Sequence, residues 1–322
     1  MQILEGLDGL RRLPAGGVLS VGNFDGVHLG HQEILRRARE LRDRTSGAAL
    51  AVITFEPHPL TVLKPELAPP RLTPPAFKQL LLRGAGVDQL VILPPEPDVL
   101  NLTAEQFWAI LRDEVRPAHL VEGESFNFGR GRAGTIEKLH AWAAPGPVKL
   151  TIVEPVEVAL LDFTIVPVSS SFIRWLLARG RVRDAAICMG HPYVLEGEVV
   201  RGHQRGAGIG VPTANLRPAG QLIPGDGVYA GRSRFEGVIY PAAVSVGTMP
   251  TFGDDQRQVE VHLIGFAGDL YGKTLSVEIV DWVREQCKFK SIDALKEQLL
   301  GDIRYCAERA AIDPTVAVAR AG

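Results

Sequence analysis

The chain has 322 residues, of which 46% are hydrophobic and 22% charged, and its formal net charge is −2. This composition is that of an ordinary globular protein, and the length suits two domains with cores of their own. The small net charge gives no support for a nucleic-acid or anionic-membrane partner, and no apolar run reaches the length of a membrane span. Cys188, Cys287 and Cys306 lack metal or redox spacing, so we expect a reducing, cytoplasmic location.

Residues 1–180 alternate strand-like and helix-like segments, which is typical of a parallel sheet with crossover helices. Near the start, VLSVGNFDGVHLGHQEIL (18–35) combines a short apolar strand, a turn from Gly22 and a helical pattern that begins around His28 and His31. The start of a helix carries free N–H groups and a partial positive charge, and here it points beyond the strand. We therefore expect an anion site, with a nucleotide phosphate as the favoured anion.

Other interpretations of this turn have less support. The loop has neither the lysine of GxxxxGK[ST] nor the spacing of GxGxxG. Zinc stays open for two histidines, although neither HExxH nor a nearby cysteine completes a ligand set. A single histidine is usually structural, but a pair in a Gly-rich strand-to-helix turn favours a functional role.

The string GNFDGVHLGH resembles the HxGH signature of nucleotidylyltransferases, in the form found in prokaryotic bifunctional riboflavin kinase/FAD synthetases. The resemblance implies that His28 and His31 stabilise charge on the α-phosphate of ATP during adenylyl transfer. It also implies ATP or phosphate contacts from the turn and the helix start, namely Gly22, Phe24, Asp25 and Gly30.

Later segments extend the expected sheet. Strands are predicted at 48–55, 88–94, 118–123 and 148–155, and helices at 76–82 and 104–115, the second capped by Thr103. In such sheets ligands bind beyond the carboxyl ends of the strands. The turn at 22–31, the loop at 56–59 and the segment 123–134 would therefore converge on one crevice.

By itself, the segment GESFNFGRGRAG (123–134) is as consistent with a Gly/Arg-rich surface loop as with a functional segment. It resembles the GxDFRFG segment of the same family, with departures at Ser125 and Asn127. The resemblance implies flavin or adenylyl contacts from Phe126, Asn127 and Phe128.

The segment VSSSFIRWLLARG (168–180) offers serine N-caps to a helix, which is a structural role in its own right. It also resembles the ISSTRIR motif of the family, with Phe172 in place of the first arginine. The resemblance implies phosphate contacts from Ser170, Ser171 and Arg174.

Beyond about residue 190 the apolar pattern changes to period two, with short Gly-, Pro- and Asp-rich breaks. This indicates an antiparallel sheet or small barrel. Strands are expected at 197–202, 228–235, 242–247, 259–266 and 275–280, and a final helix at about 292–311.

The segment GHQRGAGIGVPTANL (202–216) is either a Gly-rich turn or a phosphate-binding loop, in which Gly206, Gly208 and Gly210 would wrap phosphates. Thr213 and Asn215 then offer hard oxygen ligands suited to Mg²⁺.

This stretch resembles the riboflavin kinase domain, and so do GHPY, DGVYA, SVGTMPTFG, VEVHL and DLYGK, in the same order. The resemblance implies that Thr213 and Asn215 coordinate a Mg–nucleotide. It also implies that Glu260 is the base for the ribityl hydroxyl. By itself, Glu260 is an acidic residue on a strand, which is more often solvated.

We expect a doubly wound α/β nucleotidylyltransferase domain over 1–182, an antiparallel β-barrel with a terminal helix over 183–312, and a disordered tail over 313–322. The resemblance implies that the barrel makes FMN from riboflavin and ATP, and that the α/β domain makes FAD and pyrophosphate from FMN and ATP, with Mg²⁺ as cofactor. Three alternatives stay open: riboflavin kinase activity alone, a flavin-binding regulator without turnover, and adenylyl transfer to another acceptor. The sequence does not indicate an oligomeric state.

Overall fold

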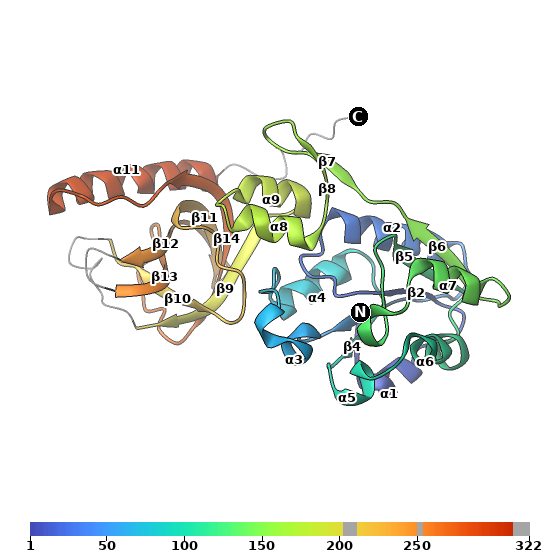
Figure 1. The fold of residues 1–322 in the computed structure, drawn as a ribbon. Helices are drawn as coiled ribbons and strands as arrows, with labels where there is room; N and C mark the ends of the chain where they lie inside the picture. The colour runs from blue at the N-terminus through green and yellow to red at the C-terminus, as the bar shows by residue number, and fades with distance from the viewer. Residues whose placement is uncertain (202–210, 250–253, 312–322) are drawn as a thin grey trace. The chain divides into compact units, whose positions relative to one another are not determined.

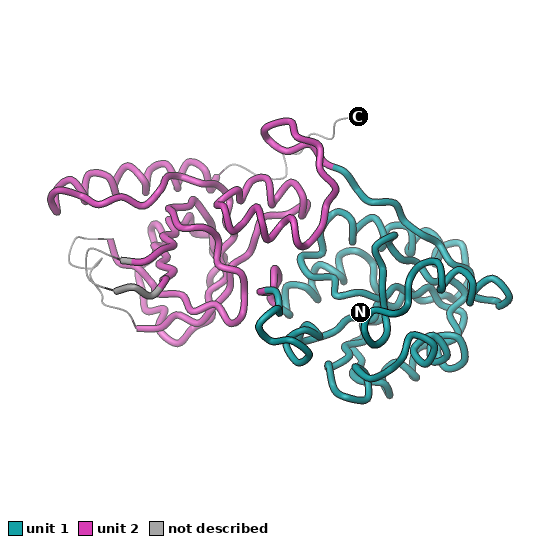
Figure 2. The backbone as a smooth tube through the Cα atoms, in the orientation of Figure 1, with its two compact units in different colours: residues 1–69, 75–157 teal, residues 70–74, 158–322 magenta. Residues whose placement is uncertain are grey.

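The structure, a computed structural model, describes residues 1–201, 211–249 and 254–311. It divides into two compact units (Figure 2). Unit 1 comprises Met1–Pro69 and Pro75–Glu157, and unit 2 comprises Pro70–Pro74 and Val158–Gly322. Within the described residues, no helix combines the length and the apolar character needed to cross a membrane. The domain boundary expected at residue 182 stays a prediction, and the expected tail lies outside the described residues.

Unit 1 contains a six-stranded parallel sheet with the order β1-β4-β3-β2-β5-β6 (Figure 1). Its strands are β1 (Gln2–Glu5), β2 (Val18–Val21), β3 (Leu50–Phe55), β4 (Gln89–Leu93), β5 (His119–Gly123) and β6 (Lys149–Val153). This order confirms the expected α/β architecture. The sequence did not predict the edge strand β1, because its four residues are too few to show a pattern.

Helices pack on both faces of this sheet. They are α1 (Gly6–Arg11), α2 (Leu29–Asp43), α3 (Leu60–Leu63), α4 (Pro75–Gly84), α5 (Pro97–Leu100), α6 (Ala104–Ala109) and α7 (Ile136–Ala143), with a π-helical turn over Ile110–Val115 and short 3₁₀ turns over Pro65–Leu67 and Arg130–Arg132. Side chains alternate along each strand, so Leu19 packs toward α1, α6 and α7 whereas Val18 packs toward α2 and α4. Thr103 and Gln106 form the expected capping box at the start of α6.

Unit 2 contains a closed barrel with the strand order β10-β13-β12-β11-β14-β9 (Figure 1). All neighbouring strands are antiparallel: β9 (Tyr193–Val200), β10 (Ala214–Pro218), β11 (Gly227–Phe235), β12 (Val238–Met249), β13 (Asp254–Leu263) and β14 (Thr274–Arg284). A two-stranded ribbon, β7 (Glu157–Ala159) and β8 (Ile165–Pro167), precedes it. The expected barrel is therefore confirmed, and β10 is a strand where the sequence suggested only a loop with metal ligands.

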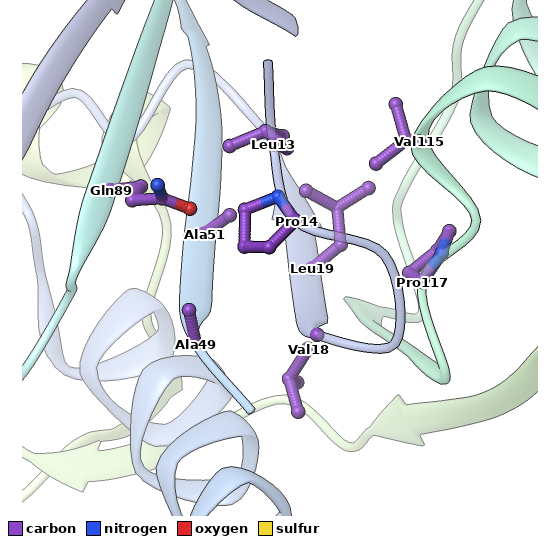
Figure 3. Close-up of a pocket in the computed structure, with 10 residues that line it drawn as sticks. Leu13, Pro14, Val18, Leu19, Ala49, Ala51, Gln89, Val115 and Pro117 are labelled. Carbon is purple, nitrogen blue, oxygen red and sulfur yellow. The ribbon is translucent and has the colours of Figure 1, made fainter. Parts of the chain in front are cut away.

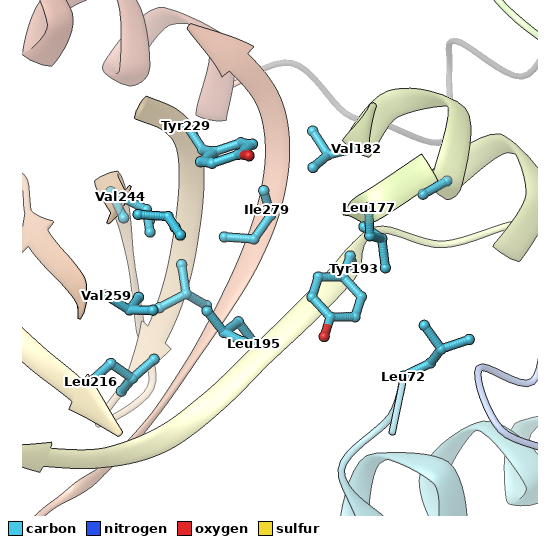
Figure 4. Close-up of a cluster of buried hydrophobic side chains, with 14 of the residues drawn as sticks. Leu72, Leu177, Val182, Tyr193, Leu195, Leu216, Tyr229, Val244, Val259 and Ile279 are labelled. Atoms are coloured by element: carbon cyan, nitrogen blue, oxygen red, sulfur yellow. The ribbon is translucent and has the colours of Figure 1, made fainter. Parts of the chain in front are cut away.

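The core of unit 2 joins the barrel interior to two helices, α8 (Ser170–Leu177) and α9 (Val182–Met189). Leu177 and Val182 from these helices belong to the same buried cluster as Tyr193 and Leu195 from β9 (Figure 4). Burial of this continuous apolar surface makes the helices part of the barrel unit.

The short segment Pro70–Pro74 also belongs to unit 2. The backbone N–H of Arg71 donates to the carbonyl of Gly220 at 3.1 Å, and its carbonyl accepts from the N–H of Leu222 at 2.9 Å. Leu72 is 2% exposed and sits in the same core (Figure 4).

A final helix, α11 (Ile292–Ala310), packs on the barrel and begins at the N-cap Ser291. Arg284 at the end of β14 donates to the Asp302 carboxylate, with Nε 3.0 Å and Nη2 2.7 Å from Oδ2. Gln298 Nε2 donates to Oδ1 of Asp302 at 2.8 Å. Asp302 is 4% exposed, so this cluster fixes the helix to the barrel wall.

Candidate functional site

The first candidate site lies where β2 meets α2 in unit 1. Helix α2 begins at Leu29, and His28 is its N-cap: the ring Nδ1 of His28 accepts from the backbone N–H of His31 at 3.4 Å. The two rings stack, with centroids 3.7 Å apart and planes 20° apart. Because Nδ1 of His28 acts as acceptor, the neutral ring carries its proton on Nε2, the form that can donate to an anionic oxygen.

His31 is held in its neutral state. Burial lowers its pKa well below the ordinary value of 6.5, and the nearby His28 and Lys78 lower it further. Within the part of the chain that the structure describes, the buried Nδ1 of His31 has no hydrogen-bond partner. The His31 imidazole therefore offers a directed hydrogen-bonding atom rather than a full positive charge.

The turn between β2 and the histidines is strained. Phe24 has φ +47° and Val27 has φ +38°, a left-handed conformation that disfavours a β-branched residue in particular. Two contacts fix the turn: Thr54 Oγ1 donates to the carbonyl of Asn23 at 3.1 Å, and Gln32 Nε2 donates to the carbonyl of Val27 at 2.8 Å. Strain of this kind persists where the surrounding structure fixes the backbone, and it is common at ligand sites.

Among the other residues predicted for this site, the structure places Phe24 in the core, 1% exposed. Its ring packs against Gly22, where a Cβ atom would lie 3.2 Å from the ring. Asp25 is half-buried in the turn, and Gly30 lies in the first turn of α2. Phe24 can therefore contact a phosphate only through its backbone.

Lys78 and Glu56 form an ion pair that the sequence did not reveal. Lys78 Nζ lies 2.9 Å from Glu56 Oε2, and the Lys78 side chain is 7% exposed. Lys78 lies in α4 and Glu56 follows β3, so this pair connects the loop after β3 to a helix. A lysine in a helical pattern is usually exposed, so the sequence did not indicate that Lys78 is buried.

Asn23 and His58 form a second contact next to the histidine site. Asn23 Nδ2 lies 3.1 Å from His58 Nε2, which connects the turn at 22–31 to the loop at 56–59. The expectation that these two segments converge is confirmed by this contact.

The segment 123–134 follows β5 as expected, but its aromatic residues are mainly structural. Phe128 is 7% exposed and lies in the core, and Phe126 stacks on it with ring centroids 5.3 Å apart. Asn127 Nδ2 donates to the carbonyl of Ser125 at 2.8 Å, which closes a local turn. Contact of these three predicted residues with flavin or the adenylyl group stays a prediction.

Ser170, Ser171 and Arg174 lie in α8, within unit 2, whereas the histidines lie in unit 1. Ser169 is the N-cap of the helix and accepts from the N–H of Phe172 at 3.2 Å. Arg174 Nε donates to the carbonyl of Pro70 at 2.8 Å. The capping expected of this serine run is therefore confirmed at Ser169, and the phosphate contacts stay predictions.

The second candidate site lies on the outer face of the barrel. Asn215 on β10 is directly opposite Glu260 on β13, and Glu260 is directly opposite Ser245 on β12. Residues opposite each other in a sheet point to the same face, so these three side chains form a row across three strands. Their neighbours Leu216 and Val261 point into the core, which leaves the row half-buried on the outside.

Two contacts that the sequence did not indicate support this row. His262 Nδ1 lies 2.8 Å from the carbonyl of Pro212, which connects β13 to the residue before Thr213. Gln286 Nε2 donates to Ser245 Oγ and to the carbonyl of Val246, both at 3.0 Å. The predicted glycines Gly206, Gly208 and Gly210 lie outside the described residues.

The donors on this face fit Mg²⁺. Thr213 and Asn215 are half-buried and offer a hydroxyl and an amide oxygen, which are hard ligands, and the Glu260 carboxyl group lies opposite Asn215. Over 1–201, 211–249 and 254–311 there is no group of three or more His, Cys, Asp and Glu residues that could hold a metal ion. A Mg²⁺ ion with few protein ligands and phosphate oxygens in its shell does not require such a group.

The described residues of unit 1 form a small apolar cavity and an open depression, and the depression borders the carboxyl end of β6. A cavity of about 10 Å³ is lined by apolar residues around the amino ends of β2 and β3, such as Val18 and Ala49 (Figure 3). An open depression of about 580 Å³ is lined by Glu33 and Arg37 of α2 and by residues 151–156 at the end of β6. The apolar cavity is too small and too apolar to hold a substrate.

Comparisons with known proteins match both parts of the chain. Residues 11–164 match the FAD synthetase family model, and residues 189–310 match the riboflavin kinase family model. The bifunctional riboflavin kinase/FMN adenylyltransferase of Pseudomonas fluorescens is 36% identical over 98% of this chain and 99% of that protein. The protein of the same name from Escherichia coli K12 is 34% identical over 94% of this chain and 96% of that protein.

Among solved structures, a macrolide-efflux protein from Streptococcus pneumoniae has a TM-score of 0.82 with 30% identity, and covers 97% of this chain and 100% of that one. Fold and matched regions together define a transferase with a nucleotidyl-transfer region followed by a kinase region. The chain belongs to the bifunctional riboflavin kinase/FMN adenylyltransferase family.

Proposed function

We propose that this chain divides the two activities of its family between its two candidate sites. The kinase activity phosphorylates riboflavin with ATP to give FMN and ADP. The adenylyltransferase activity joins AMP from a second ATP to FMN and gives FAD and pyrophosphate. The observation that supports the division best is that the histidine pair and the Asn215–Glu260 pair lie in different compact units.

At the histidine site, a phosphate oxygen of FMN attacks the α-phosphorus of ATP, and the bond to the β-phosphate oxygen breaks. The helix start of α2 and Nε2–H of His28 donate hydrogen bonds to the charge that develops on the α-phosphate. His31 is neutral, so it orients the reacting groups without the desolvation cost of a buried cation. The backbone of the turn at Gly22, Phe24, Asp25 and Gly30 completes the proposed cradle.

At the barrel site, Glu260 takes the proton from the ribityl 5′-hydroxyl, whose oxygen attacks the γ-phosphorus of ATP. Thr213 and Asn215 are the residues that would hold Mg²⁺, which neutralises phosphate charge when it is bound. Asn215 lies directly opposite Glu260, so the metal-binding residue and the base share one surface. The phosphate-wrapping role of Gly206, Gly208 and Gly210 remains part of this proposal for the kinase reaction. Phosphate contacts from Ser170, Ser171 and Arg174 remain part of the proposal for adenylyl transfer. The cytoplasmic location also stays a prediction.

A time course of product formation tests the proposal. Purified protein is incubated with Mg–ATP and either riboflavin or FMN, and riboflavin, FMN and FAD are separated by chromatography. We expect FMN to appear before FAD when riboflavin is supplied, and FAD to form when FMN is supplied. Formation of FMN without FAD would favour the kinase-only alternative, and bound flavin without ATP consumption would favour a flavin-binding regulator.

A further inference from the structure

Glu122 is a buried acidic residue that the chemistry above does not use. It lies in β5, is 2% exposed, and accepts a hydrogen bond at Oε1 from the backbone N–H of Val21 at 2.8 Å. Burial raises the pKa of its carboxyl group well above the ordinary value of 4.5. A buried carboxyl group is costly unless its contacts compensate, so its position calls for an explanation.

The strand register explains where this side chain lies. β2 pairs with β3 over four residues, Val18 to Val21, but it pairs with β5 only at Val18 and Leu19. The ladder between β2 and β5 thus ends before the carboxyl ends of the two strands. Val21 N–H, which has no β5 carbonyl opposite it, is satisfied by the Glu122 side chain instead.

The end of the ladder between β2 and β5 is also the point at which the strand order of the sheet reverses. From β2 the chain continues to β3 on one side, and from β5 it continues to β6 on the other, so β2 and β5 are the strands that flank the reversal. Ligands in doubly wound sheets bind in the crevice at such a point. Glu122 therefore holds the end of β2 beneath the crevice that a substrate would enter.

The residue that Glu122 holds leads directly into the strained turn. Val21 precedes Gly22, and the left-handed residues Phe24 and Val27 follow. On the β3 side, Ile53 O accepts from the N–H of Gly22 at 3.0 Å, and Thr54 Oγ1 donates to the carbonyl of Asn23. On the β5 side, the contact that the structure records at Val21 is the one with Glu122.

From this geometry we propose that Glu122 is a positioning residue for adenylyl transfer, which acts through Val21 and the turn to place His28 and His31. The proposal rests on the assignment of adenylyl transfer to the histidine site. A neutral carboxyl group suits this role, because it supplies an acceptor without adding negative charge under a site for phosphates. Small displacements of reacting groups cost about 100-fold in rate, so loss of this contact is expected to be visible in catalysis.

The test compares three substitutions in the full chain. Glu122→Gln keeps an acceptor at the same reach, Glu122→Leu removes the acceptor, and Glu122→Asp shortens the side chain by one methylene group. We expect Glu122→Leu to lower kcat for FAD formation from FMN by about 10- to 100-fold, with a smaller change in KM for ATP. For Glu122→Gln, kcat for FAD formation should stay within threefold of that of the unchanged protein. For Glu122→Asp, it should lie between the values of the Gln and Leu variants.

Two controls separate positioning from general stability. Glu5→Leu makes the same change at an exposed site at the end of β1 in the same sheet, and should leave both activities unchanged. FMN formation from riboflavin, measured on the same samples below the onset of thermal unfolding, should also be unchanged in all variants.

The proposal is overturned if Glu122→Leu retains FAD formation, if both activities fall together in folded protein, or if the Gln variant loses as much as the Leu variant. If Glu122→Leu does not fold, the comparison of Asp with Gln decides in the same way. Failure of the unchanged protein to make FAD from FMN would instead refute the assigned reaction, so the two failures are distinguishable.

Discussion

Asn215 and Glu260 are directly opposite each other on neighbouring strands of the barrel, with side chains on the same outer face. Their separation in the sequence gives no hint of this, and antiparallel register alone brings them together. Opposite residues in an antiparallel pair have Cβ atoms about 4.5–5.5 Å apart, which is close enough for one substrate to touch both side chains.

This pairing predicts a selective loss of the kinase activity. Replacement Glu260→Gln removes the base but keeps the size of the side chain, so kcat for FMN formation should fall by about 10²- to 10⁴-fold. FAD formation from added FMN should not change. Both rates can be measured on one preparation, and a parallel fall of FAD formation would contradict the two-site division.

Asn215→Ala should weaken the same reaction in a different way. Loss of one oxygen ligand should raise the Mg²⁺ concentration needed for half-maximal FMN formation by at least about tenfold. A Mg²⁺ titration of the kinase rate measures this, with Arg217→Ala on the same strand as an exposed control. An unchanged Mg²⁺ requirement would show that Asn215 is not a metal ligand.

His28→Ala should have the opposite selectivity. It removes both the cap of α2 and the proposed donor to the α-phosphate, so kcat for FAD formation should fall by about 10²- to 10³-fold. FMN formation should be retained. His28→Asn restores an N-cap but not the imidazole, so recovery of FAD formation in that variant would assign the loss to capping alone.

The neutral state of His31 predicts how stability depends on pH. The pKa of His31 is lowered in the folded protein. Below about pH 6.5 this imidazole therefore binds a proton in the unfolded chain but not in the folded one. The free energy of unfolding should therefore decrease as pH falls below about 6.5 and reach its full value above it. Chemical denaturation of His31→Gln at several pH values should show a smaller decrease, and an identical pH profile would mean that His31 is not held neutral.

The Arg284–Asp302 cluster predicts a stability effect without a direct catalytic one. Replacement Arg284→Met leaves the buried Asp302 carboxylate with a single amide donor, Gln298, and should destabilise unit 2 by about 3 kcal/mol. Thermal unfolding of the full chain measures this. The matched control is Lys273→Met, which breaks an exposed ion pair with Glu236 and should cost less than about 1 kcal/mol. Equal effects of the two substitutions would contradict the anchoring role.

The sequence predicted the parts of this fold that repeat or contain strong local signals. The strand–turn–helix around His28 and the period-two strands of the barrel are of this kind, because each follows from spacing within one segment. The burial of Glu122 and the Lys78–Glu56 pair could not be predicted, because each depends on partners distant in the sequence. β10 was missed as a strand because it has only five residues, begins within the PTAN motif and ends at a proline.

The chain passes between its two compact units three times, after Pro69, after Pro74 and after Glu157. A barrel fragment cut at the last of these crossings would therefore lack a segment that contributes to its own core. Gly220 and Leu222 would lose their backbone partners on Arg71, and the space that Leu72 fills would be open to water. Anyone preparing the kinase part alone should either supply residues 70–74 as a grafted segment or replace Leu222 and its neighbours with polar residues.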